Sequence, residues 1–280
     1  MKKVVILQHR LLHYRTSLFE QLRKACFDSG IDLQLVHGQA SPRESIKKDE
    51  GSLPWAREVH NHFLELSTKD LVWQPFHADL RDADLVVVMQ ESRILSNYPL
   101  IFSRLWSSRK VAYWGHGVNF QSDAPTGFRE RWKRIMLNRV DWWFAYTGLT
   151  RDILLAKHYP KEKITVLDNA IDNERFVTDL ASVDFEQMTR LRGELDLTEN
   201  GKLGLFCGSL YADKKLEFLI KAADIIHAKL PGFRLVIIGD GPSAVELKEL
   251  IKNKPWVHWV GVRKGLDKAA YFRLADVVLN

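Results

Sequence analysis

Two glycine-containing stretches constrain the fold of this chain more than any other feature of its sequence. They are Phe206–Leu216 and Leu235–Pro242, and each begins as an apolar run that stops at a glycine and leads into a helical pattern. This order is typical of the strand–loop–helix unit of a parallel α/β sheet. In such sheets anionic ligands bind at the carboxyl ends of the strands, where glycine lets the backbone approach phosphate. Because Lys214 follows the first loop, the two stretches together predict a site for a nucleotide diphosphate.

The same alternation of strand-like and helical patterns runs along the whole chain. Strand-like runs lie at Val4–Gln8, Leu33–Val36, Leu85–Met89, Val111–Trp114, Trp142–Tyr146 and Ile164–Leu167. A second series lies at Gly204–Cys207, Leu235–Ile238, Val257–Val260 and Ala275–Leu279. Amphipathic patterns lie at Ser17–Phe27, Pro99–Trp106, Arg129–Leu137, Thr150–His158, Leu216–Ala228, Ala244–Ile251 and Asp267–Leu274. Strands that alternate with helices predict an α/β fold with parallel sheets that carry helices on both faces.

A polar segment separates the two series of strands. It runs from Asp172 to Gly201 and contains a charged helical pattern near Phe185–Leu195. We therefore place a domain boundary there and expect domains at residues 1–172 and 173–280. In the first domain, Gln39–Trp55 is polar and rich in turn residues, which predicts a mobile surface loop.

The charge of the chain restricts the class of partner. The 280 residues carry a formal net charge of +6, with a pI near 9.2, which fits nucleic acid, phospholipid or a sugar nucleotide. The sequence has neither paired zinc ligands nor an aromatic RNA-binding run, so we expect no nucleic-acid partner. The first apolar run, Val4–Leu7, is too short for a signal peptide, and no run is long enough for a membrane span. These features predict a cytoplasmic protein, or one that sits peripherally on the membrane from the inner side.

Four motifs follow one another in a fixed order. They are Gly115–Gly117, Asn169–Asp172 with Phe176, Gly208–Leu210 followed by Lys214, and Gly239–Pro242. Their order and spacing resemble the GT-B glycosyltransferases, specifically the large retaining family four (glycosyl transferases group 1), and the resemblance covers nearly the whole chain. It implies two Rossmann-like domains of GT-B type: an acceptor-binding domain at residues 1–172 and a nucleotide-sugar-binding domain at 173–280.

The resemblance also implies that the second domain is incomplete. In the family, the strand that matches Ala275–Leu279 is followed by a loop with two glutamates and by further helices, whereas this sequence ends at Asn280. We therefore expect the chain to be C-terminally truncated relative to the family.

Catalytic roles are implied for His116 and Lys214. His116 follows the strand Val111–Trp114 between two glycines, and the resemblance implies that it reaches the transferred sugar; a solvent-exposed loop histidine is the alternative. Lys214, placed one turn into the helix after the Gly208 loop, would neutralise the diphosphate as the glycosidic bond breaks. Lys215 is the adjacent candidate, and a simply solvated lysine is the other interpretation.

The remaining donor-binding residues are also carried over from the resemblance. They are Gly208, Ser209, Lys215, Gly239, Gly241, Val262 and Asn169. Ser209 stands where the family commonly has an arginine, so one phosphate contact of the family is missing. Without the resemblance, Gly239 and Gly241 are equally typical of a tight strand-to-helix turn.

Acceptor-binding candidates lie at the ends of the first and third strand-like runs. They are His9, His13, Tyr14, Arg15 and Glu91. Each is also typical of an ordinary loop or helix cap, and Glu91 is the one carboxylate at the end of a central strand.

The segment Phe128–Arg139 interleaves cations with apolar residues, among them Trp132, Ile135 and Met136. As a helix it would present an apolar strip edged by basic side chains, which suits an anionic membrane surface. The alternative is that these apolar residues are the face that a helix buries against a sheet.

The resemblance implies a hexosyltransferase-type enzyme. It would move a sugar from a nucleotide-diphosphate sugar to a cell-envelope glycan or lipid-linked acceptor, with retention. We expect no metal and no cofactor besides this donor, because no Asp-x-Asp lies at the carboxyl end of a strand. Two alternatives stay open: a GT-B sugar-nucleotide epimerase, which needs an acid–base carboxylate pair, and a catalytically inactive remnant that binds a glycan or lipid.

Overall fold

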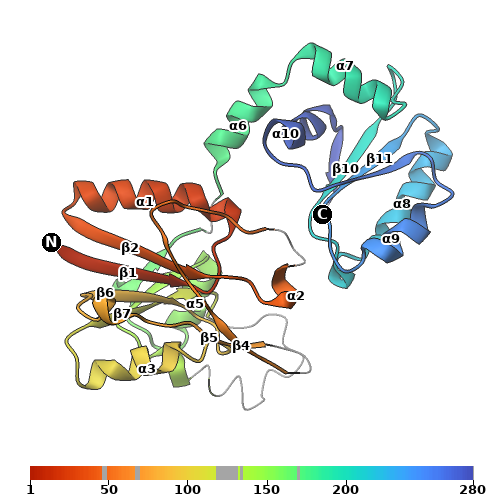
Figure 1. Ribbon diagram of the computed structural model, residues 1–280. Coiled ribbons are helices and arrows are strands. Elements are labelled where there is room, and N and C mark those ends of the chain that lie inside the picture. The colour runs from red at the N-terminus through yellow and green to blue at the C-terminus, as the bar shows by residue number, and fades with distance from the viewer. Residues whose placement is uncertain (46–48, 67–69, 118–131, 133–134, 169–170, 280) are drawn as a thin grey trace. The chain divides into compact units, whose positions relative to one another are not determined.

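The computed structural model describes residues 1–279, except for 46–48, 67–69, 118–131, 133–134 and 169–170. The described chain divides into two compact units (Figure 1). Unit 1 consists of Met1–Ser45 and Asp49–Asp172, and unit 2 begins at Asn173. Each unit has its own sheet and its own hydrophobic cores.

Unit 1 contains a seven-stranded parallel sheet in the order β3-β2-β1-β6-β7-β8-β9. Its strands are β1 (Lys2–Gln8), β2 (Ile31–Gly38), β3 (Arg57–Val59), β6 (Leu85–Met89), β7 (Lys110–Gly115), β8 (Trp142–Ala145) and β9 (Ile164–Val166). The central strands are continuous apolar runs because both of their faces are covered. In β6, for example, Val86 and Val88 face one core and Val87 faces the other.

Helices cover both faces of this sheet (Figure 1). Its helices are α1 (Thr16–Asp28), α2 (Pro42–Ser45), α3 (Asn97–Phe102) and α5 (Gly148–Leu155), with 3-10 turns η1 (His13–Arg15), η2 (Ala78–Leu80), η3 (Ser103–Leu105) and η4 (Lys161–Lys163). Leu100 of α3 and Leu154 of α5 pack on one face, and Phe19 of α1 is fully buried on the other. Beside α1 lies an open apolar groove of about 1000 Å³, lined by Leu18, Phe144 and other residues.

A short antiparallel ribbon, β4 (His62–Glu65) and β5 (Asp70–Trp73), braces the loop that follows β6. The Val72 amide donates to the Arg93 carbonyl at 2.9 Å, and the Leu95 amide donates to the Val72 carbonyl at 2.8 Å. Val72 itself is fully buried. The ribbon therefore holds the loop that carries Arg93 against the carboxyl edge of the sheet.

Unit 2 contains a four-stranded parallel sheet in the order β12-β11-β10-β13. Its strands are β10 (Leu203–Cys207), β11 (Arg234–Ile238), β12 (Val257–Gly261) and β13 (Val277–Leu279). Its helices are α6 (Asn173–Ser182), α7 (Phe185–Glu194), α8 (Leu216–Lys229), α9 (Ala244–Ile251) and α10 (Gly265–Leu274), with the turn η5 (Ala212–Lys214). Residues of α8 and α9 pack in one core, and residues of α6, α7 and α10 pack in the other.

The predicted α/β class is confirmed, and the long elements lie close to their predicted positions. The predicted and observed bounds coincide for β6 and α9, and the observed α8 ends one residue beyond the predicted Ala228. The short strands β3, β4 and β5 and the helices α2 and α6 were not predicted. Most of the helix predicted at Arg129–Leu137 lies outside the described residues.

The interpretation of Gln39–Trp55 as a surface loop is correct for part of its described residues: Arg43, Glu50 and Ser52 are exposed, whereas others are buried. Ser41 is completely buried, and Leu53 is 7% exposed and belongs to the core. Glu44 in α2 forms ion pairs with His9 and Arg93. Some polar residues of this stretch are therefore bonded inside the protein, while others face solvent.

The exposed apolar strip predicted within Phe128–Arg139 is wrong for Trp132 and Met136. Met136 is 5% exposed and lies in the core, and Trp132 packs against the same core. For these two residues the alternative, a helix face buried against the sheet, is confirmed, while Ile135 is 55% exposed. Residues 128–131, 133 and 134 lie outside the described part of the chain.

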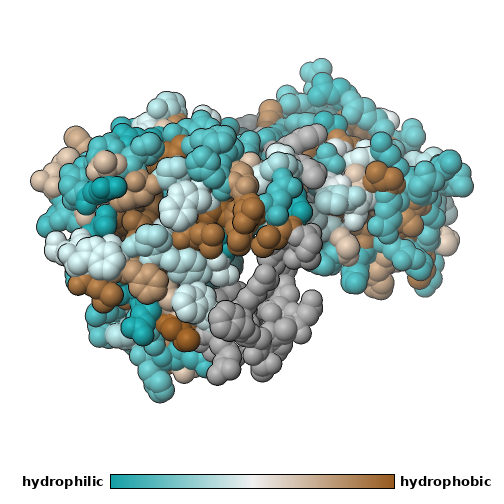
Figure 2. Space-filling model, turned by 60° about the horizontal axis from the view of Figure 1, so that its bottom comes forward, coloured by the Kyte–Doolittle hydropathy of each residue, from teal (hydrophilic) through white to brown (hydrophobic). Residues whose placement is uncertain are grey.

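The surface carries a mixture of polar and apolar side chains. On the face that Figure 2 shows, hydrophobic patches interrupt a largely hydrophilic surface. Among the helices that the structure describes, none combines the length and the apolar character needed to cross a membrane.

Candidate functional site

The carboxyl edge of the seven-stranded sheet gathers polar side chains from four neighbouring strands. His9 follows β1, Gln90 and Glu91 follow β6, His116 follows β7, and Tyr146 follows β8. Because the carboxyl ends of parallel strands lie at one edge, residues far apart in sequence meet there.

An ion network joins the loops that follow β1 and β6. Arg93 Nη2 lies 2.7 Å from Glu44 Oε1, and Arg93 Nε lies 2.7 Å from Glu91 Oε2. His9 lies between the carboxylates, with Nε2 3.1 Å from Glu44 Oε1 and Nδ1 3.6 Å from Glu91 Oε1. The Glu44 side chain is 13% exposed and that of Glu91 is 33% exposed. Glu91 is therefore the carboxylate of this network that a ligand reaches more easily.

The network keeps both carboxylates ionised. Burial disfavours the charged forms of Glu44 and Glu91, but the charges and hydrogen bonds of His9 and Arg93 outweigh it. As a result the pKa of Glu44 lies far below its usual range, and the pKa of Glu91 is lowered as well. At neutral pH both groups accept hydrogen bonds from hydroxyls, and neither holds a proton to donate.

The backbone around His116 is held by Gln90. Gln90 Oε1 accepts a hydrogen bond from the Gly117 amide at 3.1 Å, and Gln90 Nε2 donates to the Gly117 carbonyl at 3.2 Å. A Cβ atom at Gly115 would lie 2.6 Å from Gln90 Cβ, and Gly117 has a φ of +76°. Both glycines are therefore needed for the turn itself.

The exposed ring of His116 packs on Tyr146, with ring centroids 4.2 Å apart and an interplanar angle of 36°. The Tyr146 hydroxyl accepts a hydrogen bond from Arg15 Nη2. Partial burial of the imidazole and the charge of Arg15 lower the pKa of His116, and the charge of Glu91 opposes them. The imidazole is therefore mainly neutral at neutral pH, which suits hydrogen bonding to uncharged sugar hydroxyls.

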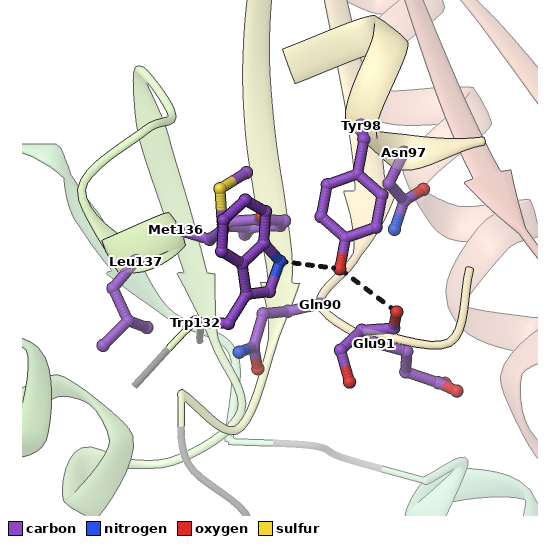
Figure 3. A pocket seen from close by; sticks show the side chains of 9 residues that line it. Gln90, Glu91, Asn97, Tyr98, Trp132, Met136 and Leu137 are labelled. Carbon is purple, nitrogen blue, oxygen red and sulfur yellow. Dashed lines mark hydrogen bonds between the residues drawn. The ribbon is translucent and has the colours of Figure 1, made fainter. Parts of the chain in front are cut away.

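A small hollow with room for about one water molecule opens beside Gln90 and Glu91 (Figure 3). The Trp132 indole N–H donates to the Tyr98 oxygen at 3.1 Å, and the Tyr98 hydroxyl donates to the Ser92 carbonyl at 3.1 Å. The ring centroids of Tyr98 and Trp132 lie 6.0 Å apart. Aromatic walls with a few placed polar groups are typical of small-molecule sites.

The other acceptor candidates take different positions in the loop after β1. His13 Nδ1 lies 3.0 Å from the Asp49 carbonyl oxygen, which ties η1 to the loop before β3. Tyr14 is 38% exposed, whereas Arg15 is only 6% exposed. Arg15 is therefore largely buried, unlike Tyr14.

In unit 2 the loops after β10 and β11 are joined through their backbones. The Gly208 amide donates to the Ile238 carbonyl, and the Leu210 amide donates to the Asp240 carbonyl, both at 3.0 Å. The loops within Phe206–Leu216 and Leu235–Pro242 therefore form one structure at the carboxyl edge of the four-stranded sheet.

Gly239 and Gly241 are required by this packing. A Cβ atom at Gly239 would lie 1.9 Å from the Gly208 carbonyl oxygen, and Gly239 has a φ of +139°. A Cβ atom at Gly241 would lie 2.5 Å from the Leu210 carbonyl oxygen. The interpretation of these residues as a tight turn is therefore correct, whatever they bind.

The glycine amides in these loops already have acceptors. The Gly208 amide is bonded to Ile238, the Gly239 amide to the Gly261 carbonyl and the Gly241 amide to Asp240 Oδ1. These three amides are therefore already engaged within the protein.

The predicted helical position of Lys214 is wrong. Lys214 is the last residue of η5, Lys215 has left-handed backbone angles (φ 50°, ψ 48°), and α8 begins only at Leu216. Both lysines are exposed, as is Ser209. Val262 follows β12 and is 42% exposed, and Asn169 lies outside the described residues.

Four residues of the unit 1 edge were not singled out from the sequence: Gln90, Arg93, Tyr146 and Glu44. Gln90 and Tyr146 directly follow β6 and β8, so the strand-end rule that found His116 also applied to them. Glu44 and Arg93 carry no comparable signal. Glu44 lies 35 residues from His9 and 49 residues from Arg93 in the sequence, and only the fold brings them into contact.

Similarity to known proteins is strongest in unit 2. Residues 201–280 match the family model of the glycosyl transferases group 1. A curated relative, alpha-monoglucosyldiacylglycerol synthase of Acholeplasma laidlawii, is 26% identical over 121 residues. That match covers 42% of this chain and 30% of the relative.

Solved structures match the whole chain in fold. A glycosyltransferase from Rickettsia africae has a TM-score of 0.65 at 12% identity, over 99% of this chain and 72% of that one. The UDP-GlcNAc 2-epimerase of Neisseria meningitidis, solved with UDP-GlcNAc, has a TM-score of 0.58 at 15% identity, over 99% and 76%. At such identities these structures show the fold alone. The match therefore places residues 201–280 in the glycosyl transferases group 1, and the solved structures show the GT-B fold along the whole chain.

Proposed function

We propose that this chain moves a sugar from a nucleotide-diphosphate sugar to a glycan or lipid-linked acceptor, with retention. The observation that carries the proposal is the match of residues 201–280 to the group 1 glycosyl transferases, at the loops where two strands of unit 2 end. Unit 2 is then the donor-binding domain and unit 1 the acceptor-binding domain.

On the donor side, Lys214 and Lys215 are the proposed contacts to the diphosphate. The glycine amides of the same edge are already bonded, and Ser209 supplies a hydroxyl without a charge. As the bond between the sugar C1 and the phosphate oxygen breaks, negative charge builds on the diphosphate, and a nearby ammonium stabilises it. The acceptor oxygen bonds to C1 from the same face, and its proton passes to the departing phosphate.

On the acceptor side, Glu91 and the hollow beside it are proposed to bind acceptor hydroxyls, together with His9, His13 and Tyr14. An ionised carboxylate with an accessible oxygen accepts such hydrogen bonds. A neutral His116 is proposed to contact the transferred sugar.

The epimerase alternative needs one carboxylic acid that holds a proton. Glu44 and Glu91 are the carboxylates at this edge that share His9, and the pKa of each is lowered. This electrostatic arrangement favours the transferase over the epimerase. The lipid-linked acceptor draws support from the curated relative, whose name is that of a glycolipid synthase.

A transfer assay with radiolabelled UDP-glucose and GDP-mannose, each with diacylglycerol vesicles or with none, tests the proposal. Label in the lipid phase supports the transferase, and its loss in His116→Ala places the reaction at this edge. Label in a second sugar nucleotide without acceptor would support the epimerase instead. Bound donor that stays unchanged in every mixture would support the inactive binding protein and contradict the proposal.

A further inference from the structure

The Arg15 guanidinium occupies an unusual environment for a buried cation. It is 6% exposed, and among the ion pairs of the described residues none joins Arg15 to a carboxylate. Its hydrogen-bond partners are neutral: Nη1 donates to Gln8 Oε1 at 2.9 Å, and Nη2 donates to the Tyr146 hydroxyl. Burying a charge costs free energy unless hydrogen bonds or other charges compensate. The burial of Arg15 therefore points to a role beyond packing.

Aromatic rings surround this cation. The Arg15 Cζ lies 5.2 Å from the ring centroids of both Trp114 and Tyr146 and 5.7 Å from that of Tyr14. Cation–π contacts of this kind hold the guanidinium in place and partly compensate its burial. The hydrogen bond to Tyr146 then fixes the ring on which His116 packs.

We infer that Arg15, acting through Tyr146, is the positioning residue for the imidazole of His116. The turn that carries His116 is fixed by Gln90, but that contact reaches only the backbone of Gly117. The ring itself is held by its packing on Tyr146, whose hydroxyl Arg15 holds. The catalytic consequence of this arrangement rests on the proposed function, whereas the arrangement itself does not.

Arg15 acts on His116 through its charge as well as through its hydrogen bond to Tyr146. Among the described residues, the charged and titratable groups that face the His116 ring are Arg15 from η1, Glu91 from the loop after β6, and Tyr146 after β8. Arg15 lowers the pKa of His116 and Glu91 raises it, and partial burial of the ring has the largest effect. Arg15 thereby adds to the effect of burial, and both favour the neutral form of the imidazole.

Titration of the His116 ring by NMR, assigned with His116→Gln, tests the inference without any substrate. In Arg15→Met the pKa of His116 is expected to rise above that of the wild type while staying below its ordinary value, since the burial of the ring remains. Arg15→Lys retains the charge and is expected to keep the wild-type pKa. Arg10→Met is the comparison variant, because Arg10 is equally buried in the same loop but pairs with the carboxylates of Asp49 and Glu44.

Tyr146→Leu removes the ring and is expected to abolish the ring-current shift of the His116 signals. In the transfer assay, Arg15→Met is expected to lower kcat roughly 10- to 100-fold, with KM for the donor changed less than about twofold, and Arg15→Lys to recover part of the rate. A folded Arg15→Met or Tyr146→Leu whose His116 titration and shifts overlay the wild type would overturn the inference. A wild type that shows the expected titration but transfers nothing would contradict the proposed function alone.

Discussion

The carboxyl edges of the two sheets differ in what holds them together. In unit 1, side chains bond to side chains: Arg93 joins Glu44 to Glu91, and Arg15 joins Gln8 to Tyr146. In unit 2, backbone bonds to backbone, and a Cβ atom at Gly239 would overlap the Gly208 carbonyl. The first edge therefore depends on paired side chains, whereas the second depends on Gly239 and Gly241, where a Cβ atom would overlap backbone.

This difference agrees with the proposed division of labour. The nucleotide diphosphate of the donor is the same throughout a family. Loops in which glycine packs directly against backbone suit a ligand that does not change. Acceptors vary, and an edge made of side chains allows new hydrogen-bonding patterns on the same fold. Substitutions at the two edges test this difference directly.

Gly239→Ala is expected to have the largest effect. Because the new Cβ atom would lie 1.9 Å from the Gly208 carbonyl oxygen at a φ of +139°, the variant should lose about 3–5 kcal/mol of unfolding free energy. Urea denaturation followed by circular dichroism measures it. Gly193→Ala in α7 is the control, since nothing lies within 4 Å of its Cβ position, and it should gain about 0.5–1 kcal/mol. Equal stability of Gly239→Ala and wild type would refute the packing interpretation.

Glu44→Gln is expected to cost about 2–3 kcal/mol at pH 7, because it leaves His9 and Arg93 with a neutral partner. The folded-state pKa of Glu44 is lowered, so its stabilising effect is present above the ordinary pKa of 4.5 and is lost as pH falls below it. The difference in unfolding free energy between wild type and variant should therefore shrink from pH 7 to pH 3. Glu162→Gln, an exposed control, should show no such trend. A difference that is independent of pH would exclude the ion network as its cause.

Lys215→Gly is expected to have the smallest effect and the opposite sign. Lys215 has a left-handed backbone at the start of α8, and glycine adopts this conformation without steric cost. The variant should gain about 0.5–1 kcal/mol, less than the full strain because glycine also gains freedom in the unfolded chain. Lys215→Ala retains the Cβ atom and should gain nothing. Thermal unfolding of the two variants measures this difference. Equal Tm values for Lys215→Gly and Lys215→Ala would mean that the turn is not strained.

The long elements could be predicted because their patterns are local. Strands buried on both faces are continuous apolar runs, and β6 and β11 were found within one residue at each end. The strands β3, β4 and β5 have three or four residues each, too few for a period to be recognised. The start of α8 at Leu216 was found, but the left-handed Lys215 separates Lys214 from this helix, and no glycine marks that break.

The candidate site could be predicted only in part. His116 and Glu91 follow strand ends, and the strand-end rule finds such residues from the sequence. The partners of these residues, such as Glu44 and Arg15, come from loops whose polar composition indicates solvent rather than burial. Their positions depend on long-range contacts, and a single sequence carries no local trace of those.

The most direct test of the central claim is a calorimetric titration of the chain with UDP, GDP, UDP-glucose and GDP-mannose. The account predicts saturable binding of the nucleotides of one base, weakened at least about tenfold in Lys214→Ala through loss of a charged phosphate contact. Lys229→Ala, at the far end of α8, should bind like the wild type. A folded wild-type chain that binds none of the four, or a Lys214→Ala variant that binds as tightly as the wild type, would contradict it.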